Sequence, residues 1–289
     1  MGSIERQLVD EEMTPADAEA ALSLSAEAGW NQTAADWRFM LREGHGIGVR
    51  DTSGRWIGSS LALPLGGSLC WISMALVAKD QRRRGLGTRL LRRAIELVRS
   101  FRRVAGLDAT ELGRSVYLPL GFRDLYASSR LRLEAPVQAG PPPGGCAIRP
   151  LVAADLLAVA AFDAPRSAMQ RRHVLDYLFR QAPEAAWLAE ADGRIVGFAL
   201  GRPGRSAFQS GPVVAEHEDV ARALIAHALA RTSLAVILDV PDAHGGIRRW
   251  LDSAGAVRKR GFIRMTLGEP PLGLADPSRI FTLAGPELG

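Results

Sequence analysis

A basic segment with two glycines, residues 82–88, has the residue types and spacing of an anion-binding site. Its order is Arg82, Arg83, Arg84, Gly85, Leu86, Gly87 and Thr88. Because glycine has no side chain, the backbone here can approach a ligand closely. If a helix begins in this segment, its first N–H groups lack intrahelical partners, and the positive end of its dipole favours an anion. The segment therefore predicts a diphosphate site, although a tight turn with solvated arginines would have the same sequence.

The flanking sequence predicts the elements that would hold such a site. An apolar, strand-like run covers residues 69–77 and leads directly into the basic loop. After the loop, apolar side chains recur at three- and four-residue steps, at Leu90, Leu91, Ala94, Ile95, Leu97, Val98 and Phe101. Polar residues fill the other steps, as one solvated helix face requires. We expect a strand, a phosphate loop and a helix in succession.

Two later segments complete the pattern. Residues 107–110 read as the end of a second strand, and residues 116–122 as a short helix that closes on a glycine turn. The combination resembles the GNAT superfamily, the acyl-CoA-dependent N-acetyltransferases. The phosphate-loop signature of that family, Gln/Arg-x-x-Gly-x-Gly/Ala, matches residues 82–87. Its Leu-Tyr-x-x-x-Gly-Phe signature matches Val116, Tyr117, Gly121 and Phe122.

Other nucleotide-binding folds fit the loop less well. A P-loop needs Lys-Ser/Thr after its second glycine, and this chain has Thr88 followed by Arg89. A dinucleotide-binding fold needs a third glycine, where this chain has Leu90.

The resemblance implies transfer of an acetyl group from acetyl-CoA to an amine by direct attack, without a covalent enzyme intermediate. The backbone N–H groups near Ala75, Leu76 and Val77 would then polarise the thioester carbonyl. Tyr117 matches the tyrosine that protonates the departing thiolate in the family, although a tyrosine here could equally be a core aromatic. Family members often hold the pantetheine with an asparagine seven residues before this tyrosine, and Thr110 stands there in this chain.

The acceptor site is less well defined. The first helices would line part of it, and Trp30, Asn31 and Trp37 stand out there, although the tryptophans are better interpreted as core residues. The amine must be neutral to attack, yet its pKa in solution is about 10, so a base or a water chain must remove a proton. Asp108 and Glu111 lie at the right strand end, but neither is identifiable as the base. The acceptor stays open: a small polyamine, an amino acid, an antibiotic or a protein terminus.

Composition limits the other possibilities. The chain has 289 residues, 47% hydrophobic and 23% charged, as expected for a globular protein of two domains. It has no apolar run of membrane-spanning length and no export signal, so we expect a cytoplasmic protein without membrane partners. Two cysteines and five dispersed histidines offer no metal-ligand spacing, so no metal is expected. The net charge of +5 could suggest nucleic-acid binding, but no recognition motif accompanies it, and we do not expect that function.

The chain divides into two halves with a shared plan. Residues 135–145 are rich in proline and glycine and read as a linker between domains at 1–134 and 146–289. Gly54–Gly58 corresponds to Gly193–Gly197, and the Gly121 turn to Gly255. We therefore expect an α/β fold of two tandem GNAT-like domains, each a mixed, mostly antiparallel sheet flanked by helices.

The second half lacks the features that would bind a coenzyme. Where the first half has its phosphate loop, the second has residues 215–221, which contain no glycine. Glu216, Glu218 and Asp219 would face a diphosphate there, and like charges repel. Leu251 stands opposite Tyr117 when the halves are aligned. We expect one acetyl-CoA site per chain, in the first half; the alternative is a regulatory module that binds acetyl-CoA without turnover.

Overall fold

The computed structural model describes residues 8, 10–134, 142–232 and 234–289, and its strands form one continuous, mixed sheet of thirteen strands. The strand order is β1-β2-β3-β4-β5-β12-β6-β11-β10-β9-β8-β7, with β13 paired to β10. Most neighbouring strands are antiparallel, and the exceptions are the parallel pairs β4–β5 and β10–β11. Part of the expected linker, residues 135–141, lies outside the described residues.

The first half of the sheet contains five strands in sequence order. Its strands are β1 (Asp10–Met13), β2 (His45–Arg50), β3 (Trp56–Pro64), β4 (Leu69–Val77) and β5 (Val104–Ala109). Its helices are α1 (Ala18–Glu27), α2 (Ala34–Glu43), α3 (Leu86–Ser100) and α4 (Glu111–Tyr117), with short 3-10 turns η1 (Pro15–Asp17), η2 (Lys79–Gln81) and η3 (Leu118–Leu120). The strand, loop and helix expected around residues 69–100 therefore form as predicted.

The second half repeats this plan. Its strands are β7 (Ala147–Pro150), β8 (Trp187–Ala191), β9 (Arg194–Arg202), β10 (Phe208–Ala215), β11 (Val236–Pro241) and β13 (Ile280–Thr282). Its helices are α5 (Leu156–Ser167), α6 (Arg172–Gln181), α7 (Glu218–Leu229) and α8 (Gly245–Ser253), with 3-10 turns η4 (Ala153–Asp155) and η5 (Pro183–Ala185). In both halves a parallel strand pair is connected through a helix, α3 in the first and α7 in the second.

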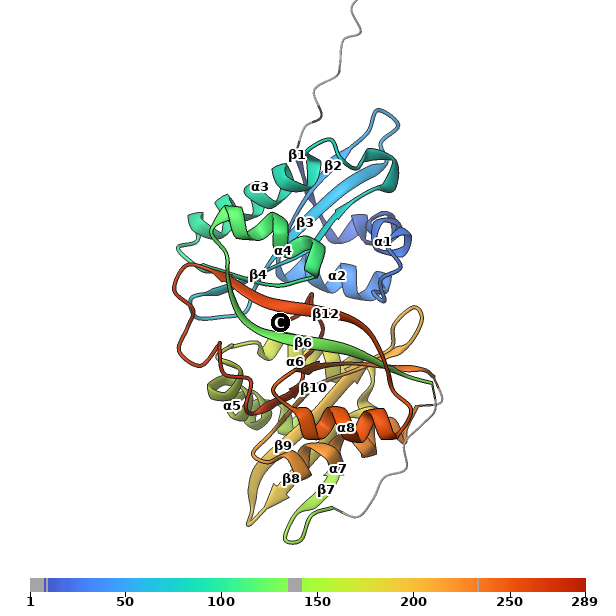
Figure 1. Cartoon of the computed structure of the whole chain (residues 1–289), viewed down its shortest axis with the longest axis vertical. Coiled ribbons are helices and arrows are strands. Elements are labelled where there is room, and N and C mark those ends of the chain that lie inside the picture. Colours follow the sequence, from blue (N-terminus) through green and yellow to red (C-terminus); the bar gives the residue numbers. More distant parts are fainter. Residues whose placement is uncertain (1–7, 9, 135–141, 233) are drawn as a thin grey trace, which may run out of the picture.

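The two halves exchange their last long strands. β6 (Arg123–Leu133), from the first half, lies between β12 and β11, while β12 (Val257–Leu267), from the second half, lies between β5 and β6. Figure 1 shows these two strands side by side across the middle of the molecule. The expected sequence boundary near residue 134 stays a prediction, but each half of the sheet is completed by a strand from the other.

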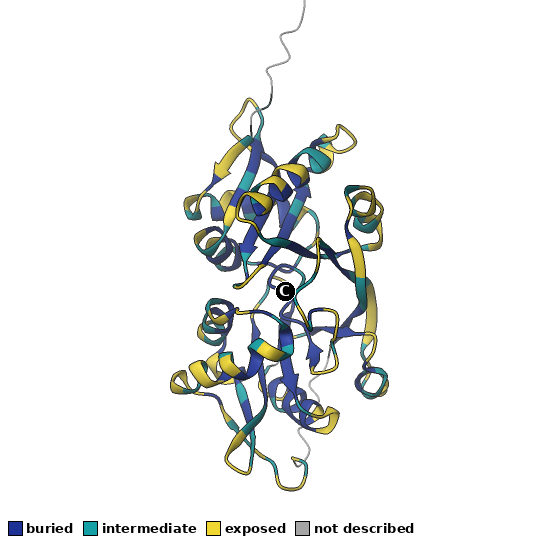
Figure 2. Ribbon diagram, turned by 90° about the vertical axis from the view of Figure 1, so that its left-hand side faces the viewer, coloured by how far each residue is buried: buried dark blue, intermediate teal, exposed yellow. Residues whose placement is uncertain are grey.

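Helices cover both faces of the first half because its central strands are buried on both sides. Leu63 packs in one cluster with Trp37, whereas its neighbour Ala62 packs in another with Leu91 and Ala94 of α3. Neighbouring residues of a strand point to opposite faces, so the two clusters lie on opposite sides of the sheet. Figure 2 shows the buried residues concentrated along the strands, with exposed residues on the outer helices and loops.

Residues 283–289 lie between the two halves. The indole Nε1 of Trp71 donates to the Pro286 carbonyl at 2.8 Å, and a guanidinium nitrogen of Arg171 donates to the Gly289 oxygen at 2.5 Å. Leu288 is fully buried. Figure 1 marks this end of the chain near β6 and β12, so the tail forms part of the contact between the halves.

Within the part of the chain that the structure describes, no helix is long and apolar enough to cross a membrane, and the cytoplasmic location stays a prediction.

Candidate active site

The strands β4 and β5 start as a parallel pair and then separate. Their register holds for three residue pairs, from Leu69–Val104 to Trp71–Gly106. Beyond Trp71, β4 continues to Val77 along β3, while β5 pairs with β12. The pairing of β4 with β3 shifts between Ser73 and Leu76, and Met74 has a φ of 51°, so a bulge bends β4 at this point. The result is a gap between two strands, bordered by the backbone of Ile72–Val77.

The phosphate loop begins where β4 ends. Gly85 precedes the first residue of α3 with a φ of 78°, a left-handed conformation that glycine adopts without strain. The Nε of Arg82 donates to the Val77 carbonyl at 3.1 Å and so ties the loop to the strand. Arg83 also has a positive φ, 62°, which is uncommon for a residue with a side chain. The first turn of α3, whose first N–H groups have no intrahelical partners, lines the same groove as Ala75, Leu76 and Val77.

The space above this loop is open. A Cβ atom added to Gly85 would have no neighbour within 4 Å, and one added to Gly87 would meet only Val77 Cγ2, at 3.5 Å. The groove that contains the loop has about 1650 Å³ of empty space, including open solvent. Its walls include Ala75, Leu76, Val77, Arg82, Arg83, Gly85, Leu86, Gly87, Thr88, Thr110 and Tyr117. The groove thus brings together all but one of the residues that sequence analysis assigned to coenzyme binding.

The exception is Arg84, which does not belong to the groove wall. Its guanidinium donates to the Gln81 side chain at 2.5 Å, and the residue is exposed. The three arginines of the loop are therefore not equivalent, and only Arg82 and Arg83 line the groove.

Tyr117 lies at the end of α4, where the groove meets a second cavity. Thr110 is the N-cap of α4, and its hydroxyl accepts a hydrogen bond from the Gly113 N–H at 3.2 Å. Burial raises the pKa of the Tyr117 phenol above its usual value, because the charged phenolate is poorly solvated there. The phenol is therefore protonated at neutral pH and able to donate a proton.

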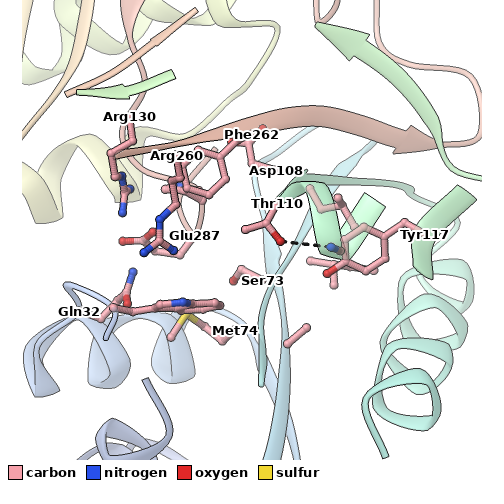
Figure 3. A pocket seen from close by; sticks show the side chains of 16 residues that line it. Gln32, Ser73, Met74, Asp108, Thr110, Tyr117, Arg130, Arg260, Phe262 and Glu287 are labelled. Carbon is pink, nitrogen blue, oxygen red and sulfur yellow. Dashed lines mark hydrogen bonds between the residues drawn. The ribbon is translucent and has the colours of Figure 1, made fainter. Parts of the chain in front are cut away.

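The second cavity lies between the two halves and has about 790 Å³ of empty space, including open solvent. It is lined by Trp30, Gln32, Ile72, Ser73, Met74, Ala75, Leu107, Asp108, Thr110, Gly113, Tyr117, Arg130, Arg260, Phe262, Pro286 and Glu287. Five of these also line the groove: Trp30, Ala75, Thr110, Gly113 and Tyr117. Figure 3 shows Tyr117 beside Thr110 at one end of this cavity, with Arg130, Arg260, Glu287 and Gln32 toward the other end. A reacting group near Tyr117 would be within reach of both spaces.

Asp108 is held in an ion pair and is not a free base. Its carboxylate accepts from Nε and Nη2 of Arg264, each at 2.9 Å, and both side chains are 1% exposed. The two residues face each other across β5 and β12. Burial raises the pKa of Asp108, and the Arg264 guanidinium opposes that shift. The carboxylate of Asp108 is therefore engaged by β12.

Of the other expected acceptor residues, only Trp30 lines the cavity. Trp37 is fully buried and donates from Nε1 to Ser25 Oγ at 3.0 Å, so it is a core residue of the α1–α2 packing. Asn31 is buried and binds the second half, donating to the Ala207 carbonyl at 2.9 Å. Glu111 is exposed at the start of α4, outside the cavity wall. These three residues do not form a common site.

The residues that the second half and β6 bring to the cavity were not identified from the sequence. Arg130 comes from β6, Arg260 and Phe262 from β12, and Glu287 from the tail. No local motif marks them, because the strand exchange alone places them opposite β4. The alternation of Arg258, Arg260 and Arg264 within a strand was the available signal, and it does not identify a partner.

In the second half, the corresponding gap is filled by the chain itself. β10 and β11 also start as a parallel pair, at Phe208–Val236 and Gln209–Ile237. β13 then pairs with β10 at Val213–Thr282 and Val214–Ile280, and the Leu283 N–H donates to the Asp239 carbonyl of β11 at 2.8 Å. β13 therefore occupies the place that stays open between β4 and β5.

The loop before α7 is also engaged in ion pairs within the protein. The Glu216 carboxylate pairs with Arg166 and, at 3.5 Å, with Arg279. Glu218 and Asp219 are exposed in the first turn of α7. This negative charge stands where the first half has Gly85 and Gly87, and it disfavours a phosphate group.

Family models match both halves of the chain. The model of the acetyltransferase (GNAT) family matches residues 9–122, and the model of an acetyltransferase (GNAT) domain matches residues 159–281. The N-acetyltransferase YitH of Bacillus subtilis (strain 168) is 26% identical over 245 residues, which are 81% of this chain and 82% of the relative.

Solved structures share the fold of the whole chain. An acetyltransferase structure from Pyrococcus horikoshii has a TM-score of 0.78 and 20% identity, and the match covers 100% of this chain and 98% of that one. A tandem GNAT protein from the clavulanic acid biosynthesis pathway has a TM-score of 0.67 and 17% identity, over 91% of this chain and 100% of that one. The two successive family matches show that this chain belongs to the GNAT family of N-acetyltransferases and carries two GNAT domains in tandem.

Proposed function

We propose that the first half transfers the acetyl group of acetyl-CoA to the amine of a small acceptor, by direct attack on the thioester. The observation that carries this proposal is the position of Tyr117, which lines both the groove of the phosphate loop and the cavity between the halves. A thioester that enters from the groove and an amine that enters from the cavity would meet beside it.

The groove offers a separate contact for each part of the coenzyme. The N–H groups of Leu86, Gly87 and Thr88 begin α3 and suit the diphosphate, with Arg82 and Arg83 adding positive charge. The pantetheine would lie in the gap between β4 and β5, where free backbone groups of β4 can pair with its amides as a neighbouring strand would. Backbone N–H groups near Ala75 to Val77 would polarise the carbonyl.

The transfer forms a C–N bond and breaks the C–S bond of the thioester. The acceptor must first lose a proton to water or to a base, because an ammonium has no free electron pair. The attacking nitrogen then loses a second proton to water as the amide forms, and the departing thiolate gains one from the Tyr117 phenol, which solvent then reprotonates. Tyr117 is the one side chain to which we assign a catalytic role.

The second half would shape the acceptor site and bind no coenzyme. β13 fills its strand gap, and Glu216 and its neighbours make its loop acidic. Its contribution is instead the wall formed by Arg260, Phe262 and Glu287. Ligand cavities favour such domain interfaces, and a cavity lined from both halves suits a small acceptor better than a protein surface.

The proposal is tested by a panel of amines with acetyl-CoA, in which CoA release and acetylated product are both measured. We expect equal amounts of thiol and acetylated amine. The Tyr117→Phe variant should bind acetyl-CoA as the wild type does but turn over about 10- to 1000-fold more slowly, the scale of general acid catalysis. Wild-type turnover in Tyr117→Phe would refute the catalytic role. Coenzyme binding without product from any amine would favour a regulatory module that senses acetyl-CoA.

A further inference from the structure

The end of the cavity away from Tyr117 carries a guanidinium without an ion-pair partner. Within the described residues, Arg260 makes no salt bridge or hydrogen bond, although it lines the cavity. It stands directly opposite Arg130 in the register of β12 and β6. Like charges that face each other across two strands destabilise a sheet unless something neutralises them. Arg260 itself is exposed to solvent, and an anion in the cavity would pair with its guanidinium.

Two carboxylates beside this pair are already engaged: Glu287 of the cavity wall pairs with Arg202, and Asp239 pairs with Arg130. Asp239 accepts from Nε and Nη2 of Arg130 at 2.8 and 2.7 Å, and from the Gln209 amide at 3.1 Å. Asp239 is fully buried on the far side of Arg130, in the register of β11 and β6. It neutralises Arg130 and leaves Arg260 uncompensated. Burial, and then the charge of Arg130, lowers the pKa of Arg260, as expected for a cation that lacks its counter-ion.

Two buried polar atoms without partners line the same cavity. The Oε1 atom of Gln32 and the hydroxyl of Ser73 have no hydrogen bond within the described residues, and these side chains are 4% and 7% exposed. Unpaired buried polar atoms are rare in folded proteins, because each loses its hydrogen bonds to water without replacement. Figure 3 shows Gln32 at the Arg260 end and Ser73 between that end and Tyr117. A polar ligand along this line would satisfy both.

We infer that the acceptor is a small amine that carries an anionic group, a carboxylate or a phosphate, and that Arg260 of the second half binds this group. The amine then lies toward Ser73 and Tyr117, and the anion lies at the opposite end beside Arg260 and Gln32. The position of the amine rests on the proposed acetyl transfer. The position of the anion rests only on the charges and unpaired polar atoms around Arg260. This arrangement assigns the choice of acceptor to the second GNAT domain.

The test compares amines in matched pairs that differ in the anionic group. Suitable pairs are β-alanine with propylamine, lysine with cadaverine, and phosphoethanolamine with ethanolamine. Turnover with acetyl-CoA and calorimetric binding to the CoA-saturated protein are both measured. A charge-assisted contact corresponds to about 10- to 100-fold in kcat/KM, so at least one anionic member should exceed its partner by that factor. The pair that shows this preference also tells whether the site binds a carboxylate or a phosphate.

The variant Arg260→Gln should abolish this preference while leaving acetyl-CoA affinity unchanged. Lys259→Gln is the matched control, because it removes one positive charge from the neighbouring position of the same strand, which is also exposed but lies outside the cavity wall. It should keep the full preference. A preference that survives in Arg260→Gln, or a wild type that favours the uncharged partners or binds none of the compounds, would overturn the inference.

The two readouts separate this inference from the proposed function. If anionic amines bind in an Arg260-dependent manner but none is acetylated, the anion site stands and the transferase proposal fails. If amines are acetylated without any preference for an anionic group, the transferase proposal stands and the anion site is wrong.

Discussion

Substitution of Gly87 by aspartate would place a carboxylate in the phosphate groove without disturbing the fold. Gly87 is the second residue of α3, and an added Cβ would make one ordinary contact, with Val77 Cγ2 at 3.5 Å. An acidic side chain in the first turn of a helix is compatible with the helix dipole. Gly85 is less suitable, because its φ of 78° would strain any residue with a side chain by about 1–2 kcal/mol. Gly87→Asp should therefore unfold at the wild-type temperature.

The expected loss of coenzyme affinity follows from Coulomb's law. Two like charges 4 Å apart repel by about 1 kcal/mol in water and by about 4 kcal/mol at an effective dielectric constant near 20. The groove is open to solvent, so the lower part of this range applies to each of the two diphosphate charges. With about 1.4 kcal/mol per factor of ten, acetyl-CoA should bind about 10- to 1000-fold more weakly.

The assay is calorimetric titration of acetyl-CoA into Gly87→Asp and Gly87→Asn, at low and at high salt. The two side chains have nearly the same shape, so the difference in affinity reports the charge. That difference should shrink as salt rises, because the groove is accessible to counter-ions. Equal affinities for the two folded variants at low salt would refute the diphosphate site at the start of α3.

Two further predictions concern pH and stability. Because burial raises the pKa of Tyr117, kcat/KM should rise with pH as the amine loses its proton and should not fall through loss of the Tyr117 proton below about pH 10. A fall near pH 8 that disappears in Tyr117→Phe would contradict this. The second prediction concerns Arg202, which is buried between Asp36 of the first half and Glu287 of the tail. Arg202→Met leaves two buried carboxylates unpaired and should lower the free energy of unfolding by about 3–5 kcal/mol in urea titrations. The exposed Arg194→Met on the same strand should change it by no more than about 0.5 kcal/mol. Equal midpoints for the two variants would show that the buried pairs contribute nothing.

The phosphate loop could be predicted because its determinants lie close together in the sequence. An apolar run, glycines and a helical repeat are local signals: they predicted a strand at residues 69–77 and a helix after the basic loop, and the structure has Leu69–Val77 and a helix that begins at Leu86, within the loop segment.

The strand exchange and the acceptor cavity could not be predicted in this way. Asp108 pairs with Arg264, a residue 156 positions later, and Asn31 binds Ala207, 176 positions later. Such contacts depend on which strands become neighbours, and a period-two pattern does not specify the neighbour. The residues that line the cavity from β12 and the tail follow from that pairing alone.

A crystal structure of the protein with CoA would distinguish the two equivalent strand gaps, for which we propose different occupants. We predict one CoA per chain, with its diphosphate at the N–H groups of Leu86, Gly87 and Thr88 and its pantetheine between β4 and β5. β13 should remain paired with β10 in the second half. CoA bound at residues 215–221, or a first-half gap that stays closed to the pantetheine, would contradict the account.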